Sequence, residues 1–348
     1  MSEEHKRRVH YSGKYPRKFE EKYKEQNPEK YADTIEHVIG KGSTPAGMHI
    51  SIMVREILDA LDIKKGERGL DCTLGYGGHT SAMLEKLEGE GHIVGLDVDP
   101  IESAKTVERL RNKGFGEEIF TMKLINFAEI DKVAEEFGKF DFILADLGVS
   151  SMQIDNPERG FSYKTDGPLD LRLDPTRGVS AAERLKELDY DELRGMFEEN
   201  SDEPYAHEIA NAILKRRKNG QPIERTTDLK NTVEEALKFL PEKERKEEVK
   251  KSCARVFQAL RIDINREFEV LYELLDKLPG VLNPGGRVAI LTFHSGEDRL
   301  VKKSFKTFKK EGLYDYITED VIRPSAEECV RNPRAKSTKL RVAVRSND

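Results

Sequence analysis

Acidic and polar side chains close most of the apolar segments that the sequence predicts to be strands. Asp71, Asp97 and Asp146 each end such a segment, and His294 follows another. In an open sheet of parallel strands, ligands bind at the edge formed by the carboxyl ends of the strands. Carboxylates there can accept hydrogen bonds from ligand hydroxyl groups. We expect a ligand site at this edge, because packing alone explains acidic strand ends poorly.

A glycine-rich turn, Gly75–Thr80, comes shortly after Asp71. It departs from the dinucleotide pattern G-x-G-x-x-G, because Thr80 stands where the third glycine is expected. Asp97, at the end of the next strand, is placed to accept hydrogen bonds from both ribose hydroxyls of a nucleoside and to repel a 2′-phosphate. S-adenosylmethionine needs that acceptor but has no pyrophosphate, so it fits better than a nicotinamide dinucleotide. A plain turn and a nicotinamide-dependent oxidoreductase are the alternatives.

The segments that would position these residues alternate between strands and helices. Apolar runs predict strands at Arg68–Cys72, His92–Leu96, Ile119–Leu124 and Phe140–Ala145. Helical periodicity is present at Ile52–Leu61, Thr80–Leu87, Ile101–Lys113 and Ile130–Phe137. This alternation predicts an α/β fold, a mostly parallel, doubly wound sheet with helices on both faces.

The alternation stops after the fourth strand. Helical patterns follow at Ala181–Asn200, Tyr205–Asn219 and Thr227–Leu240, with one long helix at Cys253–Leu278. The sheet resumes after a turn at Pro284–Gly286, with strands at Arg287–Thr292 and Lys339–Arg345. The simplest organisation is an all-α domain, residues 153–249, inserted into a sheet domain of residues 48–152 and 250–348, preceded by a charged extension at residues 1–47.

The bulk composition limits the class of protein. Of the 348 residues, 36% are charged and 37% are hydrophobic, and no apolar run is long enough to predict a membrane span. The N-terminus lacks the apolar core of a secretory signal. The three cysteines lie far apart without a CxxC pair, so no structural metal site is predicted. These features favour a cytoplasmic protein.

A nucleic-acid partner would need local clusters of basic residues, because the formal net charge is −6. One cluster is Lys215–Lys218. The other lies between positions 331 and 345, where no acidic residue occurs, and consists of Arg331, Arg334, Lys336, Lys339, Arg341 and Arg345. A solvated surface is the usual meaning of such runs. Contact with RNA phosphates is the functional alternative.

Several longer segments carry recognisable motifs. They are HISIM (His49–Met53), DCTLGYGGHT (Asp71–Thr80), GLDVDP (Gly95–Pro100), DFILADLGVSS (Asp141–Ser151), DNPERGFSYKTDGPLDLRLDP (Asp155–Pro175), VFQALRIDIN (Val256–Asn265), LNPGGRVAILTFHSGEDR (Leu282–Arg299) and NPRAKSTKLRVAVR (Asn332–Arg345). In these segments the chain resembles the bacterial MraW family, ribosomal RNA small-subunit methyltransferase H. The resemblance implies a class I, Rossmann-like methyltransferase with an inserted helical domain. It also implies methyl transfer from S-adenosylmethionine to N4 of a cytidine in the decoding region of 16S rRNA.

The same resemblance assigns roles to individual residues around the cofactor. It implies that Asp97 holds the ribose and that Phe127 lies against the adenine. The remaining cofactor contacts that it implies are Gly77, Gly78 and His79, at the methionine and adenosine parts, and Asp146 and Gln153, which complete the site.

The acceptor atom sets a further demand. The N4 amine of cytosine is a poor nucleophile, and a hydrogen-bond acceptor on it would localise its lone pair and later take a proton. Many amino methyltransferases carry an Asn/Asp/Ser-Pro-Pro-aromatic motif after the fourth strand, whereas this chain has Asp146-Leu147-Gly148-Val149. We hypothesise that Asp146, or His294 as the next candidate, polarises N4. A structural role for His294 is the alternative.

The residues predicted to contact the substrate RNA are Arg159, Arg172, Arg334 and Lys336. The first two lie in a loop where acidic residues are interleaved, so a salt-bridged loop that orders the inserted domain is the alternative. The expected partner is 16S rRNA in the small ribosomal subunit, with the protein as a monomer or homodimer.

Two features depart from the family pattern. Residues 1–47 extend beyond the start of most members, and Gly296 stands where the family motif carries leucine. These departures keep two alternatives open, a paralogue that methylates another RNA nucleotide and a catalytically silent ribosome-assembly factor.

Overall fold

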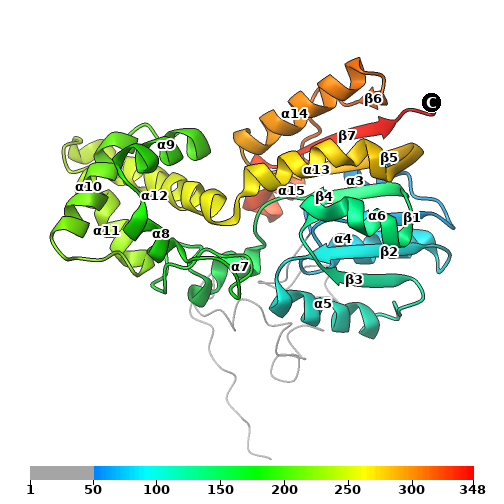
Figure 1. Cartoon of the computed structure of the whole chain (residues 1–348), viewed down its shortest axis with the longest axis horizontal. Helices are drawn as coiled ribbons and strands as arrows, with labels where there is room; N and C mark the ends of the chain where they lie inside the picture. Colours follow the sequence, from blue (N-terminus) through cyan, green and yellow to red (C-terminus); the bar gives the residue numbers. More distant parts are fainter. Residues whose placement is uncertain (1–50) are drawn as a thin grey trace, which may run out of the picture. The chain divides into compact units, whose positions relative to one another are not determined.

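The computed structural model describes residues 51–348 (Figure 1). The predicted extension at residues 1–47 lies outside the described residues. Within the described part of the chain, none of the helices is both long and apolar enough to cross a membrane.

A seven-stranded sheet in the order β3-β2-β1-β4-β5-β7-β6 forms the centre of the fold. Strands β1 to β5 are parallel to their neighbours, while β7 pairs antiparallel with both β5 and β6. The strands are β1 Arg68–Asp71, β2 His92–Asp97, β3 Phe120–Leu124, β4 Phe140–Asp146, β5 Leu282–Thr292, β6 Tyr314–Ile317 and β7 Lys339–Arg345. The predicted α/β class with a mostly parallel sheet is confirmed.

Helices cover both faces of this sheet. Successive residues of β4 point to opposite faces, so Ile143 joins the core on one side and Leu144 the core on the other. The core that contains Leu144 is closed by α3 Val54–Leu61, α4 Gly78–Leu87 and α5 Pro100–Asn112. The core that contains Ile143 is closed by α6 Ile130–Phe137, α13 Glu267–Val281 and α14 Ser295–Lys310.

Between β4 and β5 the described chain forms helices and loops but no strand. Up to α12 the helices are α7 Ser151–Asp155, α8 Ala181–Glu187, α9 Tyr190–Ser201, α10 Ala206–Lys218, α11 Thr226–Ala236 and α12 Glu242–Asn265. Figure 1 shows α8 to α11 gathered around the long helix α12. They bury a third apolar core, separate from the two that flank the sheet. Helix α12 runs through the boundary predicted at residues 249–250, and Val256 and Leu260 still pack in this third core.

Two of the predicted helices are divided in the structure. The single helix predicted at Cys253–Leu278 is wrong, because Arg266 adopts a left-handed conformation with φ of 50° and separates α12 from α13. The division has a packing reason, since α12 contributes to the third core and α13 to a core of the sheet. The helix predicted at Ala181–Asn200 is also interrupted, where Asp189 forms a capping box that starts α9.

The turn predicted at Pro284–Gly286 lies inside β5. It forms an irregularity in the pairing with β4, and Gly285 has a positive φ of 72°. Three elements of the C-terminal region are not predicted by the sequence patterns: α14, β6 and a short helix, α15 Ala326–Arg331.

Candidate active site

The strand ends named from the sequence lie along one edge of the sheet. Asp71 is in register with Gly95 of β2 and Leu144 of β4, so Asp97 and Asp146 each lie two residues further toward the same edge. Asp146 is in turn in register with Leu291 of β5, shortly before His294. The fold therefore brings together the residues that the strand-end pattern selects.

Asp71 anchors the start of the glycine-rich turn. It is 1% exposed, accepts a hydrogen bond from Thr80 Oγ1 at 2.6 Å, and accepts another from the backbone N–H of Thr73 at 3.0 Å. The hydroxyl of Thr73 also accepts the backbone N–H of Asp146 at 2.6 Å. These bonds tie the loop after β1 to the end of β4, and they give Thr80, the departure from the dinucleotide pattern, a structural role.

The glycines of the turn are required by the protein's own packing. Gly77 has a φ of 80°, and a Cβ atom there would lie 2.7 Å from Thr106 Cγ2. A Cβ atom at Gly78 would lie 2.0 Å from Ser51 Oγ. The turn can therefore pack against these neighbouring side chains and start α4 only with glycine at these positions.

Asp97 presents its carboxylate to backbone donors. Its Oδ2 accepts the N–H of Gly75 at 2.9 Å, and its Oδ1 accepts the N–H of Asp99 at 2.8 Å. Burial raises the pKa of Asp97 to about 6, although these backbone hydrogen bonds oppose the increase. Because each carboxylate oxygen has two lone pairs, both oxygens retain acceptor capacity for ligand hydroxyl groups.

Asp146 lies beside His79 and has an unused oxygen. Its Oδ2 is 3.4 Å from His79 Nδ1, and His79 Nε2 is 2.9 Å from the carbonyl oxygen of Ile52. Its Oδ1 is buried and has no hydrogen-bond partner among residues 51–348. Burial raises the pKa of Asp146 to about 6, with the charge of His79 opposing the increase. A carbonyl oxygen can only accept, so His79 Nε2 carries a hydrogen, and Nδ1 either donates to the Asp146 carboxylate or accepts from a protonated Asp146.

Phe127 and Gln153 lie on two sides of the edge. Phe127 begins a short 3-10 helix, Phe127–Glu129, directly after β3 and is partly buried against the sheet core. Gln153 forms a capping box with Ser150 and donates a hydrogen bond from Nε2 to Asp99 Oδ2 at 3.0 Å. Gln153 is thus connected to the sheet edge by its hydrogen bond to Asp99, a residue that the strand-end pattern did not select. The signal for Asp99 was its position directly before Pro100, which is typical of a helix N-cap.

The arginines predicted to contact RNA already have partners in the structure. Arg159 is 11% exposed and donates to Asp99 Oδ2 at 2.7 Å. Arg172 pairs with Asp170 at 2.7 Å, and Arg334 pairs with Asp155 at 3.1 Å. For Arg159 and Arg172 this is the salt-bridged loop that the sequence left open as the alternative.

The basic clusters are only partly surface features. In α10, Arg216 is partly buried and pairs with Asp228, while the exposed Arg217 donates to the carbonyl oxygens of Lys186 and Leu188, at the end of α8. Near the C-terminus, Arg341 is 4% exposed and pairs with Asp298 at 2.7 Å. Lys336 is exposed and forms no ion pair within residues 51–348. Lys336 is therefore the predicted RNA contact that is most accessible.

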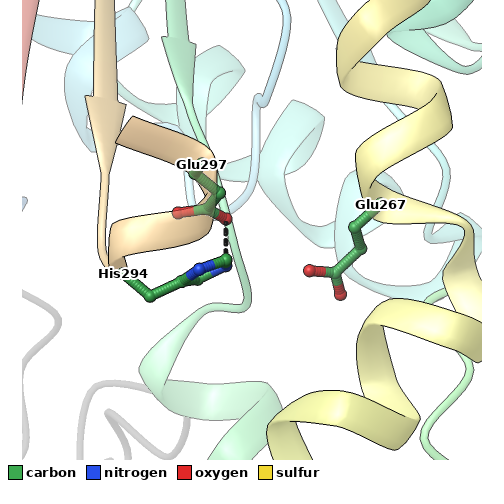
Figure 2. A group of neighbouring side chains, drawn as sticks. All are labelled: Glu267, His294 and Glu297. Atoms are coloured by element: carbon green, nitrogen blue, oxygen red, sulfur yellow. Dashed lines mark ion pairs between the residues drawn. The ribbon is translucent and has the colours of Figure 1, made fainter. Parts of the chain in front are cut away.

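His294 follows β5 at the start of α14, between two carboxylates (Figure 2). Its Nε2 is 3.2 Å from Glu297 Oε1. Glu267, from the start of α13, lies close enough that one atom from each of the three side chains falls within 4.8 Å of the others. Arg261 holds Glu267 with two hydrogen bonds of 2.8 and 2.9 Å. Neither glutamate was selected from the sequence, although Glu297 stands three residues after His294, one turn along a helix.

The edge fits the predicted methyl donor. Asp97 keeps acceptor capacity for ribose hydroxyls, and the unpaired Oδ1 of Asp146 can accept a hydrogen bond from the amino group of the methionine part. Both carboxylates are partly buried and have no arginine or lysine partner within the described chain, so a positively charged ligand would stabilise their ionised forms.

Known proteins resemble the chain over this whole region. The model of the MraW methylase family matches residues 46–346. The chain is 68% identical to ribosomal RNA small subunit methyltransferase H 1 of Agathobacter rectalis, over 99% of this chain and 100% of that protein. It is 59% identical to ribosomal RNA small subunit methyltransferase H 2 of Alkaliphilus metalliredigens, over 99% of each.

A more distant relative covers less of the chain. Ribosomal RNA small subunit methyltransferase H of Leptothrix cholodnii is 39% identical over 86% of this chain and 94% of that protein. A match to 46–346 exceeds half of the sequence, and the relatives match nearly from end to end. The chain belongs to the MraW methylase family and is an S-adenosylmethionine-dependent methyltransferase.

Proposed function

We propose that the protein transfers the methyl group of S-adenosylmethionine to N4 of a cytidine in the decoding region of 16S rRNA. The observation that carries this proposal is the sheet edge, where the ribose acceptor Asp97 and two further acceptors, Asp146 and His294, lie on strand ends of one sheet. The names of the relatives describe methyltransferases of small-subunit ribosomal RNA, and they support the choice of substrate.

In this proposal the loop after β1 and the edge residues hold the cofactor. Asp97 accepts the ribose hydroxyls, and Phe127 lies against the adenine. Gly77, Gly78 and His79 contact its methionine and adenosine parts. Asp146 accepts from the amino group, while Gln153 closes the rim through its hydrogen bond to Asp99.

The sulfonium supplies an activated methyl group, so the protein mainly has to align the acceptor nitrogen with the methyl–sulfur bond. The N4 amine donates a hydrogen bond to an acceptor at the edge, which localises its lone pair. His294 can act in this way because Nδ1 is buried and has no hydrogen-bond partner in the described chain. Asp146 is the second candidate, and in that case its unpaired Oδ1 accepts from N4 in place of the amino group of the cofactor. The proton released after transfer goes to the same acceptor.

Access for the nucleotide requires an unpaired or extruded base, because proteins reach base atoms of RNA chiefly in that form. Lys336 supplies a phosphate contact near this edge, with Arg334 beside it. We place Arg159 and Arg172 in the same proposal through the loop that they order rather than through direct contact.

The test is methylation of small subunits from a strain that lacks the gene. Purified protein and labelled S-adenosylmethionine should place label in 16S rRNA, and nucleoside mass spectrometry should identify N4-methylated cytidine in the decoding region. Label in another nucleotide, or on a ring carbon, would contradict the proposal. Complete absence of label, with normal cofactor binding, would favour a silent assembly factor.

A second candidate function is methylation of another RNA nucleotide by a paralogue. The relatives numbered 1 and 2 are 68% and 59% identical to the chain, whereas the unnumbered relative is 39% identical. A relative that covers 99% of this chain also aligns with most of residues 1–50, unlike a match over 86%. The same mass spectrometry experiment distinguishes the two functions by the identity of the labelled nucleotide.

A further inference from the structure

The carboxylate of Glu297 is fixed directly beside His294 (Figure 2). Glu297 is 3% exposed, and its Oε2 accepts the backbone N–H of Phe293 at 2.9 Å. Its Oε1 lies 3.2 Å from His294 Nε2, although the angle is not that of a hydrogen bond. Such contacts often align only when substrate binds. The carboxylate accepts a hydrogen bond from the backbone N–H of Phe293, the residue before His294. The backbone therefore fixes the position of the carboxylate relative to the imidazole.

This arrangement selects one form of the neutral imidazole. A carboxylate accepts hydrogen bonds, so the nitrogen that faces it carries the proton. Nε2 then bears the hydrogen, and Nδ1 is left with its lone pair. Nδ1 is buried and has no hydrogen-bond partner within residues 51–348. Its missing partner is a donor, which is what an exocyclic amine provides.

Gly296 packs closely against both His294 and Phe268. A Cβ atom at this position would lie 3.1 Å from His294 Nδ1 and 2.7 Å from Phe268 Cζ. The Phe268 ring lies 5.8 Å from the imidazole, centroid to centroid, and packs against it at an angle of 52°. A side chain at position 296 would therefore require the Phe268 ring to shift, and its Cβ atom would lie close to His294 Nδ1.

The other charged groups around His294 are accounted for within the described chain. Glu267, on α13, is held by Arg261 of α12, so its charge is compensated. Asp146, on β4, is affected by Glu297: besides burial, the charges of Asp71 and Glu297 raise its pKa. Since Arg261 occupies both oxygens of Glu267, the three side chains in Figure 2 are better suited to hold a proton than to hold a metal ion.

We propose that Glu297 is a positioning residue for methyl transfer, which fixes the His294 imidazole with Nδ1 as the hydrogen-bond acceptor for the exocyclic amine of the target base. This inference rests on the proposed function and names the group that acts through His294. After methyl transfer, the proton on nitrogen passes to Nδ1, and the resulting imidazolium is stabilised by the carboxylate of Glu297.

The first test compares Glu297→Gln with the unchanged protein at saturating cofactor and RNA. We expect kcat to fall by roughly 10- to 100-fold, a part of what a positioned acid or base typically contributes. The acidic limb of the kcat–pH profile should move to lower pH, because the imidazolium loses its stabilising carboxylate. A purely structural defect would lower kcat without moving that limb. An unchanged kcat and profile would overturn the proposal.

A double-mutant cycle adds a second criterion. If Glu297 acts through His294, Glu297→Gln should cost almost nothing further in a His294→Ala background. Additive losses would overturn the proposal. Wild-type protein is assayed in parallel: if it labels no amine, the proposed function has failed, whereas additive losses in an active enzyme refute only the role of Glu297.

Glu297→Asp keeps the test decisive if Glu297→Gln does not fold. It keeps the negative charge but shortens the side chain by one methylene group, which draws the carboxylate away from His294 Nε2. We expect kcat to fall while the Kd for S-adenosylmethionine, measured by calorimetry, stays unchanged. An aspartate variant with full turnover would contradict the proposal.

Discussion

Two groups of carboxylates in this molecule differ in their partners. Asp99 is fully buried and Asp170 is partly buried, and each pairs with an arginine of the loop that follows α7. Asp97 and Asp146 lie at the strand ends with no arginine or lysine partner in the described region. The first pair has structural partners in the protein itself, whereas the second keeps its capacity for a ligand.

The pKa values of the two groups follow this difference. Burial would raise the pKa of Asp99, but hydrogen bonding and charge from Arg159 bring it below its ordinary value. For Asp97 and Asp146, burial prevails and the pKa rises to about 6. Burying an acid without a compensating cation costs free energy, and such shifts concentrate at functional sites. The comparison therefore separates residues that hold the fold from residues that we propose bind the cofactor.

The largest effect should come from breaking the paired group. Arg159→Ala leaves Asp99 fully buried without its cation, which should lower the free energy of unfolding by about 3–5 kcal/mol. Denaturant titration measures this change. Arg172→Ala is the matched control from the same loop, and it should cost about 1 kcal/mol or less because both partners are about a fifth exposed. Equal effects of the two variants would contradict the distinction.

The unpaired group should respond through ligand binding instead. Asp97→Asn keeps the shape of the side chain but removes the charge, so the Kd for S-adenosylmethionine should rise roughly 10- to 100-fold. The free energy of unfolding should fall by about 1–3 kcal/mol, because the amide nitrogen that replaces one oxygen cannot accept the N–H of Gly75 or of Asp99. Asp141→Asn is the control, since Asp141 lies near the opposite end of β4 and accepts from the N–H of Arg68 and from Asn283. That variant should bind the cofactor normally.

The pH dependence sharpens the comparison further. Because Asp97 and Asp146 have a pKa of about 6, the cofactor meets ionised carboxylates only above that pH. Between pH 7 and pH 5 the Kd should rise about 10-fold if one carboxylate must be ionised, and about 100-fold if both must be. Calorimetry at these pH values tests the expectation, and a constant Kd would show that neither charge is needed.

Stability without cofactor should change in the opposite direction. A raised pKa means that these two acids favour the folded state when protonated, so their contribution increases as pH falls from about 6 toward 4. Asp99 and Asp170 have lowered pKa values, so the stability that they contribute is lost only below the ordinary pKa of 3.8. Urea unfolding at several pH values separates the two contributions.

The sequence predicts the unpaired group better than the paired group, for a physical reason. Strand ends follow from apolar runs, so Asp97 and Asp146 could be selected by local pattern alone. The partnership of Asp99 with Arg159 joins residues 60 positions apart, through a loop whose conformation no periodicity describes. The sequence also does not predict the break between α12 and α13 at Arg266, because that break is required only by the separate apolar cores in which the two helices pack. The pairing of Glu297 with His294 likewise depends on where α14 begins.

The smallest effect should be that of an exposed, unpaired cation. Lys336→Ala should weaken RNA binding only a few-fold and lower the salt dependence of log K by about 0.7–0.9, the value of one phosphate contact. Lys310→Ala, at the other end of α14 from His294, is the exposed control and should leave the salt dependence unchanged. If Lys336 were merely solvated, both variants would behave alike. Substituting an arginine that is paired to an aspartate should weaken RNA binding only where it also lowers the free energy of unfolding. This outcome would extend the contrast between paired and unpaired groups from the acidic to the basic residues.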